Sequence, residues 1–153
     1  MAYVSLDTQQ VKRANKKHKY TKEQVLQLEK CMDEKTGPLY FMKTFMKIQH
    51  PTKGEMAFKP YPYQERLIEA YNDHRFSISM LPRQTGKTTC ASGYLIWYAM
   101  FKPDSQILIA AHKYAGASDI MSRVRYAYEM LPSWIKAGVN QYNRNSIEFD
   151  NGS

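Results

Sequence analysis

The stretch from Pro82 to Thr89, which reads Pro-Arg-Gln-Thr-Gly-Lys-Thr-Thr, constrains the fold of this chain more than any other. Alternating apolar residues over 76–81 precede it, and a long apolar segment over 88–101 follows it. We therefore expect a strand, a loop and a helix in that order, which is the context of a phosphate-binding P-loop. Such a helix directs its unpaired N–H groups and the positive end of its dipole at an anion.

Three residues of this loop carry the chemistry that phosphate binding requires. Gly86 lets the main chain pass close to a phosphate, and the Lys87 ammonium would lie along the β- and γ-phosphates of a nucleotide. The Thr88 hydroxyl would take one coordination position on Mg²⁺. The common pattern also has a glycine five residues before Gly86, where this chain has Leu81. An incidental turn is therefore the alternative for the loop taken alone.

The composition indicates the kind of partner and the compartment. A formal net charge of +8 over 153 residues favours a polyanionic partner, with nucleic acid first, although a basic surface also aids solubility. Cys31 and Cys90 lie far apart and in no metal-ligand spacing, which fits a reducing compartment. The sequence has no apolar run of membrane-spanning length and no secretory leader pattern. We expect a soluble intracellular protein with no membrane partner.

Patterning divides the chain into three regions. Residues 1–20 form a basic stretch, expected to be a disordered tail, with a DNA-binding arm as the alternative. Residues 21–60 form a small helical region, and residues 61–153 form the first part of a P-loop ATPase domain. The helical periodicities fall over 22–34, 38–49, 61–72, 88–101 and 114–130, and short strand patterns fall over 55–58, 107–111 and 146–149.

The segments 76–81, 88–101 and 107–111 together form one right-handed strand–helix–strand crossover. A continuous apolar run such as Ile107 to Ala111 is typical of a buried strand in a parallel sheet. The expected fold class is therefore α/β: a P-loop NTPase with a parallel sheet flanked by helices.

Gln64 is a candidate base-recognition residue. A glutamine amide both donates to and accepts from the N6/N7 edge of adenine, as it does when proteins read adenine in DNA. Tyr61 and Tyr63 lie beside it in sequence and would cover the base. The alternative is an exposed glutamine in the first turn of a helix.

The hydrolytic half of an ATPase is missing from the sequence. It requires an apolar strand ending in aspartate, usually with a glutamate that activates water. Asp104, Asp119 and Glu129 do not end apolar strands, and Asp150 precedes the turn signal Asn-Gly. We therefore expect this chain alone to hydrolyse ATP negligibly. Because Asn-Gly predicts a hairpin whose return strand should follow, we also expect a fragment that is incomplete at its C-terminus.

Taken in order, these motifs resemble the large terminase subunit of tailed phages, most closely the contractile-tailed type. The resemblance covers roughly residues 39–153 and rests on Tyr63-Gln64, the loop 83–89, the apolar run with His112 and Lys113, and the stretch 145–153. It implies an ATP-driven motor that moves double-stranded DNA through the portal protein into the capsid, in the host cytoplasm. The small terminase subunit and further copies of the chain in a ring are the other implied partners.

The resemblance also implies roles for single residues. Lys87 and Thr88 would hold phosphate and Mg²⁺, and Gln64 would read adenine. Arg83 would be the arginine supplied in cis to the γ-phosphate, so Arg83 and Lys87 are the candidate catalytic residues. The full set of candidate nucleotide-binding residues is Gln64, Arg83, Gln84, Thr85, Gly86, Lys87, Thr88 and Thr89. The second acidic motif, the coupling motif and the nuclease domain of this family have no counterpart in the sequence.

Three other classes of protein compete with this interpretation. A helicase-like or restriction-type DNA translocase also combines an upstream glutamine with a P-loop. A non-catalytic basic DNA-binding or assembly module would carry a vestigial P-loop. A small-molecule kinase leaves Gln64 and the basic charge unexplained.

Overall fold

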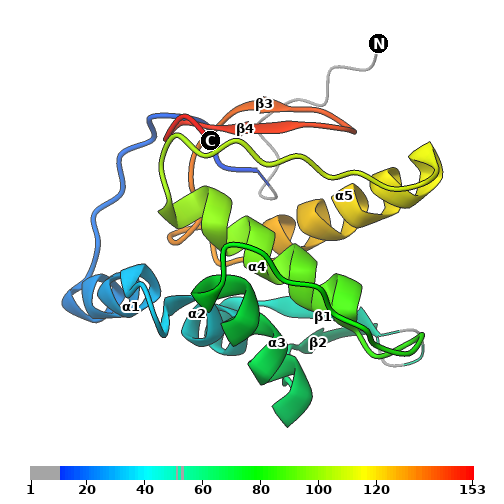
Figure 1. Cartoon of the computed structure of the whole chain (residues 1–153). Helices are drawn as coiled ribbons and strands as arrows, with labels where there is room; N and C mark the ends of the chain where they lie inside the picture. The colour runs from blue at the N-terminus through cyan, green and yellow to red at the C-terminus, as the bar shows by residue number, and fades with distance from the viewer. Residues whose placement is uncertain (1–10, 51, 53) are drawn as a thin grey trace.

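The computed structural model describes residues 11–50, 52 and 54–153, which form five helices and two small antiparallel sheets (Figure 1). The elements in chain order are α1 (Lys22–Met32), α2 (Gly37–Phe45), β1 (Lys47–His50), β2 (Gly54–Ala57), α3 (Pro62–Asp73), α4 (Lys87–Phe101), α5 (Tyr114–Glu129), β3 (Val139–Tyr142) and β4 (Ile147–Phe149). This arrangement agrees with the expected α/β class and with flanking helices.

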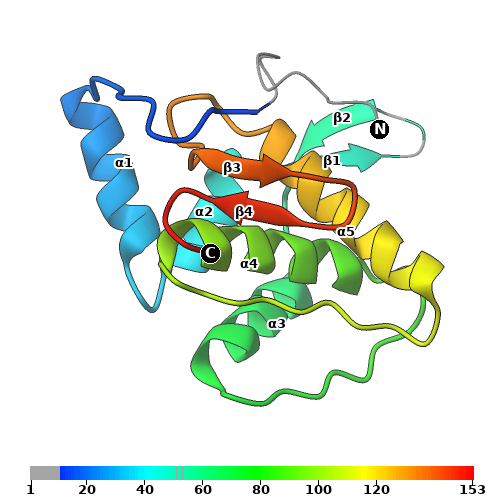
Figure 2. The same ribbon diagram turned by 90° about the horizontal axis from the view of Figure 1, so that it is seen from above.

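Helix α4 forms the centre of the molecule. Its sequence is apolar nearly all round, so it must be covered on most sides. Helices α2, α3 and α5 pack against it, and the β3–β4 hairpin lies over it (Figures 1 and 2). Trp97 is fully buried, and its indole Nε1 donates a hydrogen bond to the Cys31 carbonyl at 2.8 Å. At Gly93 a Cβ would come within 2.5 Å of Met42 Cε, so the glycine permits close packing of α2 on α4.

The segment after α2 differs from the expected helix over 38–49. Helix α2 ends at Phe45, the backbone becomes extended at Met46, and Lys47–His50 pairs antiparallel with Gly54–Ala57. The apolar stripe ends with the buried Phe45, and from Lys47 onward exposed and partly buried residues alternate, which is the period of a strand. The Phe58 N–H extends the pairing by donating to the Met46 carbonyl at 2.9 Å.

The expected parallel sheet is not formed among the described residues. The segments 76–81 and 107–111 have no assigned strand, and both sheets of the described chain are antiparallel. Figures 1 and 2 show both segments running in the same direction along α4, as the crossover requires. The side chains of Phe76, Ile78 and Met80 are 81%, 95% and 93% exposed. The chain order of a crossover unit is therefore present, but the two segments are not hydrogen-bonded into a sheet.

The C-terminal hairpin turns at residues 143–146. Strands β3 and β4 pair across residues 143–146, where the Asn143 N–H donates to the Ser146 carbonyl at 2.8 Å. The Asn151-Gly152 pair, expected to form a hairpin turn, contacts the end of α4 instead. The Asn151 side chain donates to the Ala99 carbonyl at 2.9 Å and to the Met100 carbonyl at 3.3 Å, so this turn caps the C-terminal end of α4.

Part of the basic N-terminal stretch packs on this hairpin. Residues 1–10 lie outside the described residues. Val11 is buried, the Lys12 carbonyl accepts from the Val139 N–H at 2.9 Å, and the Asn15 N–H donates to Asp150 at 3.1 Å. Residues 11–15 therefore pack against β3 and the following turn.

The burial of Trp97 generates a prediction about stability. Trp97→Phe removes the only N–H that the side chain offers and leaves the Cys31 carbonyl without that donor in a buried position. The free energy of unfolding should fall by about 2–4 kcal/mol, measured by urea denaturation.

Trp134→Phe is the matched control, because Trp134 is only partly buried at the edge of the core. Its cost should stay below that of Trp97→Phe. Equal costs for the two variants would contradict a central role for the Trp97 contact.

Candidate functional site

Helix α4 begins at a glycine in a left-handed backbone conformation. Gly86 is the N-cap residue with φ +73°, in the left-handed region that favours glycine. The first helical hydrogen bond joins the Cys90 N–H to the Gly86 carbonyl at 3.0 Å, and no side chain caps this end of the helix. The first N–H groups of a 15-residue helix are therefore left without a side-chain acceptor.

The Lys87 ammonium lies back over the loop that precedes it. Its Nζ donates to the Pro82 carbonyl at 3.0 Å and approaches the Leu81 carbonyl at 3.5 Å. The Thr85 hydroxyl also donates to the Pro82 carbonyl, at 3.0 Å. Gln84 adopts a left-handed conformation with φ +64°, which is uncommon for a residue with a side chain. These contacts fold residues 81–87 into a closed turn.

Gln64 lies against this turn and is buried, with 6% of its surface exposed. Its Oε1 accepts from the Tyr61 N–H at 2.9 Å, and its Nε2 donates to the Thr85 carbonyl at 3.0 Å. The two contacts use one of the two amide hydrogens and one of the two oxygen lone pairs. Gln64 is therefore not an exposed residue of a helical first turn, because it joins the start of α3 to the loop.

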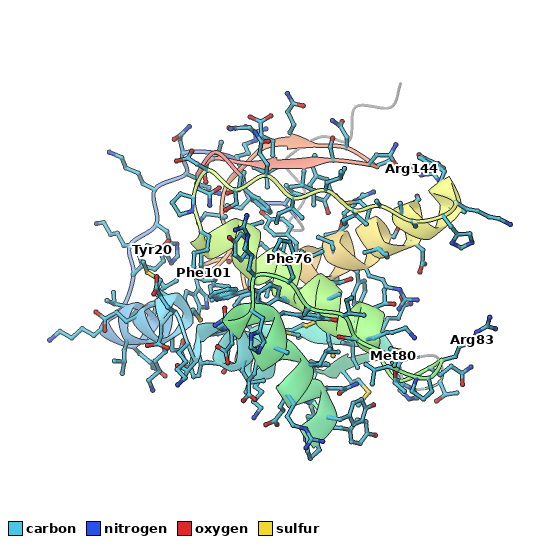
Figure 3. The ribbon with its side chains drawn as sticks, in the orientation of Figure 1. Tyr20, Phe76, Met80, Arg83, Phe101 and Arg144 are labelled. Atoms are coloured by element: carbon cyan, nitrogen blue, oxygen red, sulfur yellow. The ribbon has the colours of Figure 1, made fainter. Side chains whose placement is uncertain are left out.

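The structure thus brings together residues that are far apart in sequence. Gln64 contacts Thr85, and a Cβ on Gly86 would lie 2.6 Å from Gln64 Nε2. Arg83 and Gln84 are exposed, and Figure 3 shows Arg83 projecting away from the ribbon at the loop. Thr88 and Thr89 lie partly buried in the first turn of α4. The Arg83 side chain points into solvent rather than along the loop.

Sequence reasoning missed one contact at this site. The Tyr63 hydroxyl donates to the same Thr85 carbonyl at 2.9 Å, beside the Gln64 amide. The Tyr61 and Tyr63 rings stack with centroids 5.8 Å apart and an interplanar angle of 6°. The Tyr63-Gln64 pair in the sequence predicts an aromatic ring near the site. It does not predict that the Tyr63 hydroxyl donates to the Thr85 carbonyl.

Two further features surround the start of α4. Burial raises the pKa of the Cys90 thiol to about 11, so at neutral pH the thiol is protonated and acts as a packing group. Thr89 and Ser92 line a cavity of about 460 Å³ that β1 and α5 complete. No three His, Cys, Asp or Glu side chains gather as a metal site in residues 11–50, 52 and 54–153.

The segment that holds this loop matches one family of known proteins. The family model described as "Terminase large subunit, T4likevirus-type, N-terminal" matches residues 78–153. Over these residues the chain belongs to the large terminase subunit family, the DNA-packaging terminases of phages. The match includes the loop and α4, whereas Gln64 and Tyr63 lie before it.

In the described part of the chain, no helix is both long and apolar enough to cross a membrane.

The contact between Gln64 and Gly86 generates a prediction. Gly86→Ala should cost about 1–3 kcal/mol of folding free energy, because alanine disfavours the left-handed φ and its Cβ meets the Gln64 amide. In a Gln64→Ala background the alanine Cβ no longer meets the Gln64 amide. The free-energy cost of Gly86→Ala should therefore fall by at least about 0.5 kcal/mol.

Urea unfolding of the wild type, both single variants and the double variant measures this coupling. Additive costs would show that an alanine at residue 86 does not meet Gln64, and would contradict the close approach of α3 to the loop.

Proposed function

We propose that this chain is the ATP-binding part of a phage DNA-packaging motor, in which ATP hydrolysis drives the movement of double-stranded DNA into the capsid. One observation carries the proposal. A left-handed glycine begins a long, buried helix without a side-chain cap, and the next residue is a lysine whose ammonium lies over the loop. This loop lies inside the segment that matches the terminase family.

Lys87 would bind the β- and γ-phosphates of ATP. Its ammonium donates to the Pro82 carbonyl. When ATP binds, the ammonium would leave this carbonyl and donate to phosphate oxygens close to it instead. The N–H groups of Thr85, Gly86, Lys87, Thr88 and Thr89 would complete an anion-binding loop around the phosphates. The exposed Gln84 would close the loop over them. Arg83, which is exposed, would approach the γ-phosphate in cis and stabilise charge during hydrolysis.

Thr88 is the residue of this loop that would hold Mg²⁺. Its hydroxyl is a hard oxygen ligand, and Mg²⁺ usually completes its shell with phosphate oxygens and water. Mg²⁺ would neutralise charge on the phosphates when bound. Since the described residues hold no cluster of three or more metal-binding side chains, Thr88 would contribute one ligand rather than a protein cage.

Gln64 would recognise adenine. Its contacts with Tyr61 and Thr85 leave one amide hydrogen and one lone pair in addition to those already used, which is the pattern that the N6/N7 edge of adenine requires. The stacked rings of Tyr61 and Tyr63 offer an aromatic surface beside this amide, and Tyr61 is 64% exposed.

The segments 76–81 and 107–111 would be neighbours in a parallel P-loop sheet of the working enzyme. Two observations support this. They run in the same direction along α4, and Ile78, Met80 and Leu108 expose more than nine-tenths of their surface. Exposed apolar side chains on extended segments indicate a surface that further strands cover.

The partners of the proposed motor follow from the family. They are double-stranded DNA, the portal protein, the small terminase subunit and further copies of the chain in a ring, at the capsid in the host cytoplasm. The net charge of +8 supports the nucleic-acid partner, because counterion release favours binding of a basic protein to a phosphate backbone.

Nucleotide binding at Lys87 generates a prediction. Mg-ATP in about hundredfold excess over its Kd should raise the Tm of the wild-type chain by about 5 °C or more. Lys87→Ala should remove most of this rise in Tm, because the variant loses the ammonium that would contact the phosphates. Differential scanning fluorimetry measures both.

Lys113→Ala is the control, since Lys113 is the N-cap residue of α5 and so lies near the start of another helix but outside the site. It should keep the full rise in Tm. A wild-type chain whose Tm does not respond to Mg-ATP would contradict the proposal and would favour the basic module with a vestigial loop.

Adenine recognition by Gln64 generates a second prediction. In Gln64→Ala the ratio of the Kd for GTP to the Kd for ATP should fall toward one, because the amide that distinguishes the two bases is gone. Competition of both nucleotides with a fluorescent ATP analogue measures the ratio. An unchanged ratio would assign Gln64 to the loop alone.

A further inference from the structure

Two side chains from the start of α3 meet at one main-chain oxygen of the loop. The Thr85 carbonyl accepts from the Tyr63 hydroxyl at 2.9 Å and from the Gln64 amide at 3.0 Å. A carbonyl oxygen has two lone pairs, so these two donors satisfy it fully. The peptide unit between Thr85 and Gly86 is thus held from the side of α3.

The orientation of this peptide unit decides where the Gly86 N–H points. In a trans peptide the C=O and the following N–H lie in one plane and point in opposite directions. The described chain has no cis peptide bond, so the peptide at Gly86 is trans. Holding the Thr85 carbonyl toward α3 therefore turns the Gly86 N–H away from α3.

The two donors are themselves fixed in place. Tyr63 stacks on Tyr61, and the Gln64 Oε1 is held by the Tyr61 N–H at 2.9 Å. Leu67 and Ile68, one turn further along α3, are buried in the core against α4. Because α3 is anchored in this way, the clamp joins the loop to a rigid element rather than to a mobile side chain.

We propose that Tyr63 is a positioning residue for phosphate binding: its hydroxyl, with the Gln64 amide, orients the Thr85–Gly86 peptide so that the Gly86 N–H donates to the phosphate groups of a nucleoside di- or triphosphate. The inference rests on the proposed function of the loop and adds a residue outside the loop to it. Since the clamp acts on the main chain that contacts phosphate, its effect is the same whether or not a base is attached.

Isothermal titration calorimetry of Tyr63→Phe with Mg-ATP and with magnesium tripolyphosphate tests this directly. The variant keeps the ring and its stacking on Tyr61 and loses one hydroxyl. It should bind both ligands about three- to tenfold more weakly than the wild type, by the same factor, because one orienting hydrogen bond is lost. Tyr40→Phe, which removes a tyrosine hydroxyl from α2 rather than from the contact with the loop, should bind both ligands like the wild type.

A second measurement separates positioning from general damage to the fold. Labelling with ¹³C′-threonine and ¹⁵N-glycine selects the amides of Gly37 and Gly86, the two glycines that follow a threonine. Tripolyphosphate should shift the Gly86 resonance of the wild type downfield, and this shift should shrink in Tyr63→Phe. Gly37 is buried between α1 and α2 and should not move in either protein.

The outcomes distinguish the two levels of the proposal. A wild-type chain that binds neither ligand overturns the proposed function, and the inference with it. A wild-type chain that binds both ligands, with Tyr63→Phe unchanged in affinity and in the Gly86 shift, overturns the inference alone. A loss confined to Mg-ATP would also overturn it, since it would assign the Tyr63 hydroxyl to the base.

Discussion

The burial of α4 is the constraint on which the rest of the structure depends. A helix that is apolar on every side is stable only when other elements cover it, and here α2, α3, α5 and the β3–β4 hairpin do so. Its C-terminal end is closed by the Asn151 amide, and its N-terminal end begins at Gly86 with no side-chain cap. The helix is therefore fixed along its length and open at one end, which is what an anion-binding helix terminus requires.

The same burial positions the loop. Helix α3 packs on α4, with Leu67 and Ile68 buried, and its first turn reaches Thr85 with two hydrogen bonds. The residue that follows must be glycine, both because its φ is positive and because a Cβ would meet the Gln64 amide. The same packing of α3 on α4 therefore forms part of the core and positions the candidate site. The family match, which begins at residue 78, includes the loop and α4.

Local signals in the sequence predicted the helices well, since the apolar stripes and the glycine before Lys87 act within a few residues. The same kind of signal failed after Phe45, where pairing with residues 54–57 overrides helical periodicity. Sheet formation depends on distant partners, so the pattern over 76–81 could indicate an extended segment but not its neighbours. The loop residues were found from their spacing. The contact between the Tyr63 hydroxyl and the Thr85 carbonyl was not predicted, because it depends on how α3 packs on α4.

The central claim is that phosphate groups bind where α4 begins, and paramagnetic broadening by Mn-ATP tests it most directly. When Mn²⁺ replaces Mg²⁺, amide resonances close to the metal lose intensity first in ¹H–¹⁵N spectra. The account predicts that the amides of residues 84–89 broaden at the lowest Mn-ATP concentrations, while those of the β3–β4 hairpin keep their intensity. Broadening that begins elsewhere in the chain, or broadening by free Mn²⁺ that ATP does not alter, would contradict it.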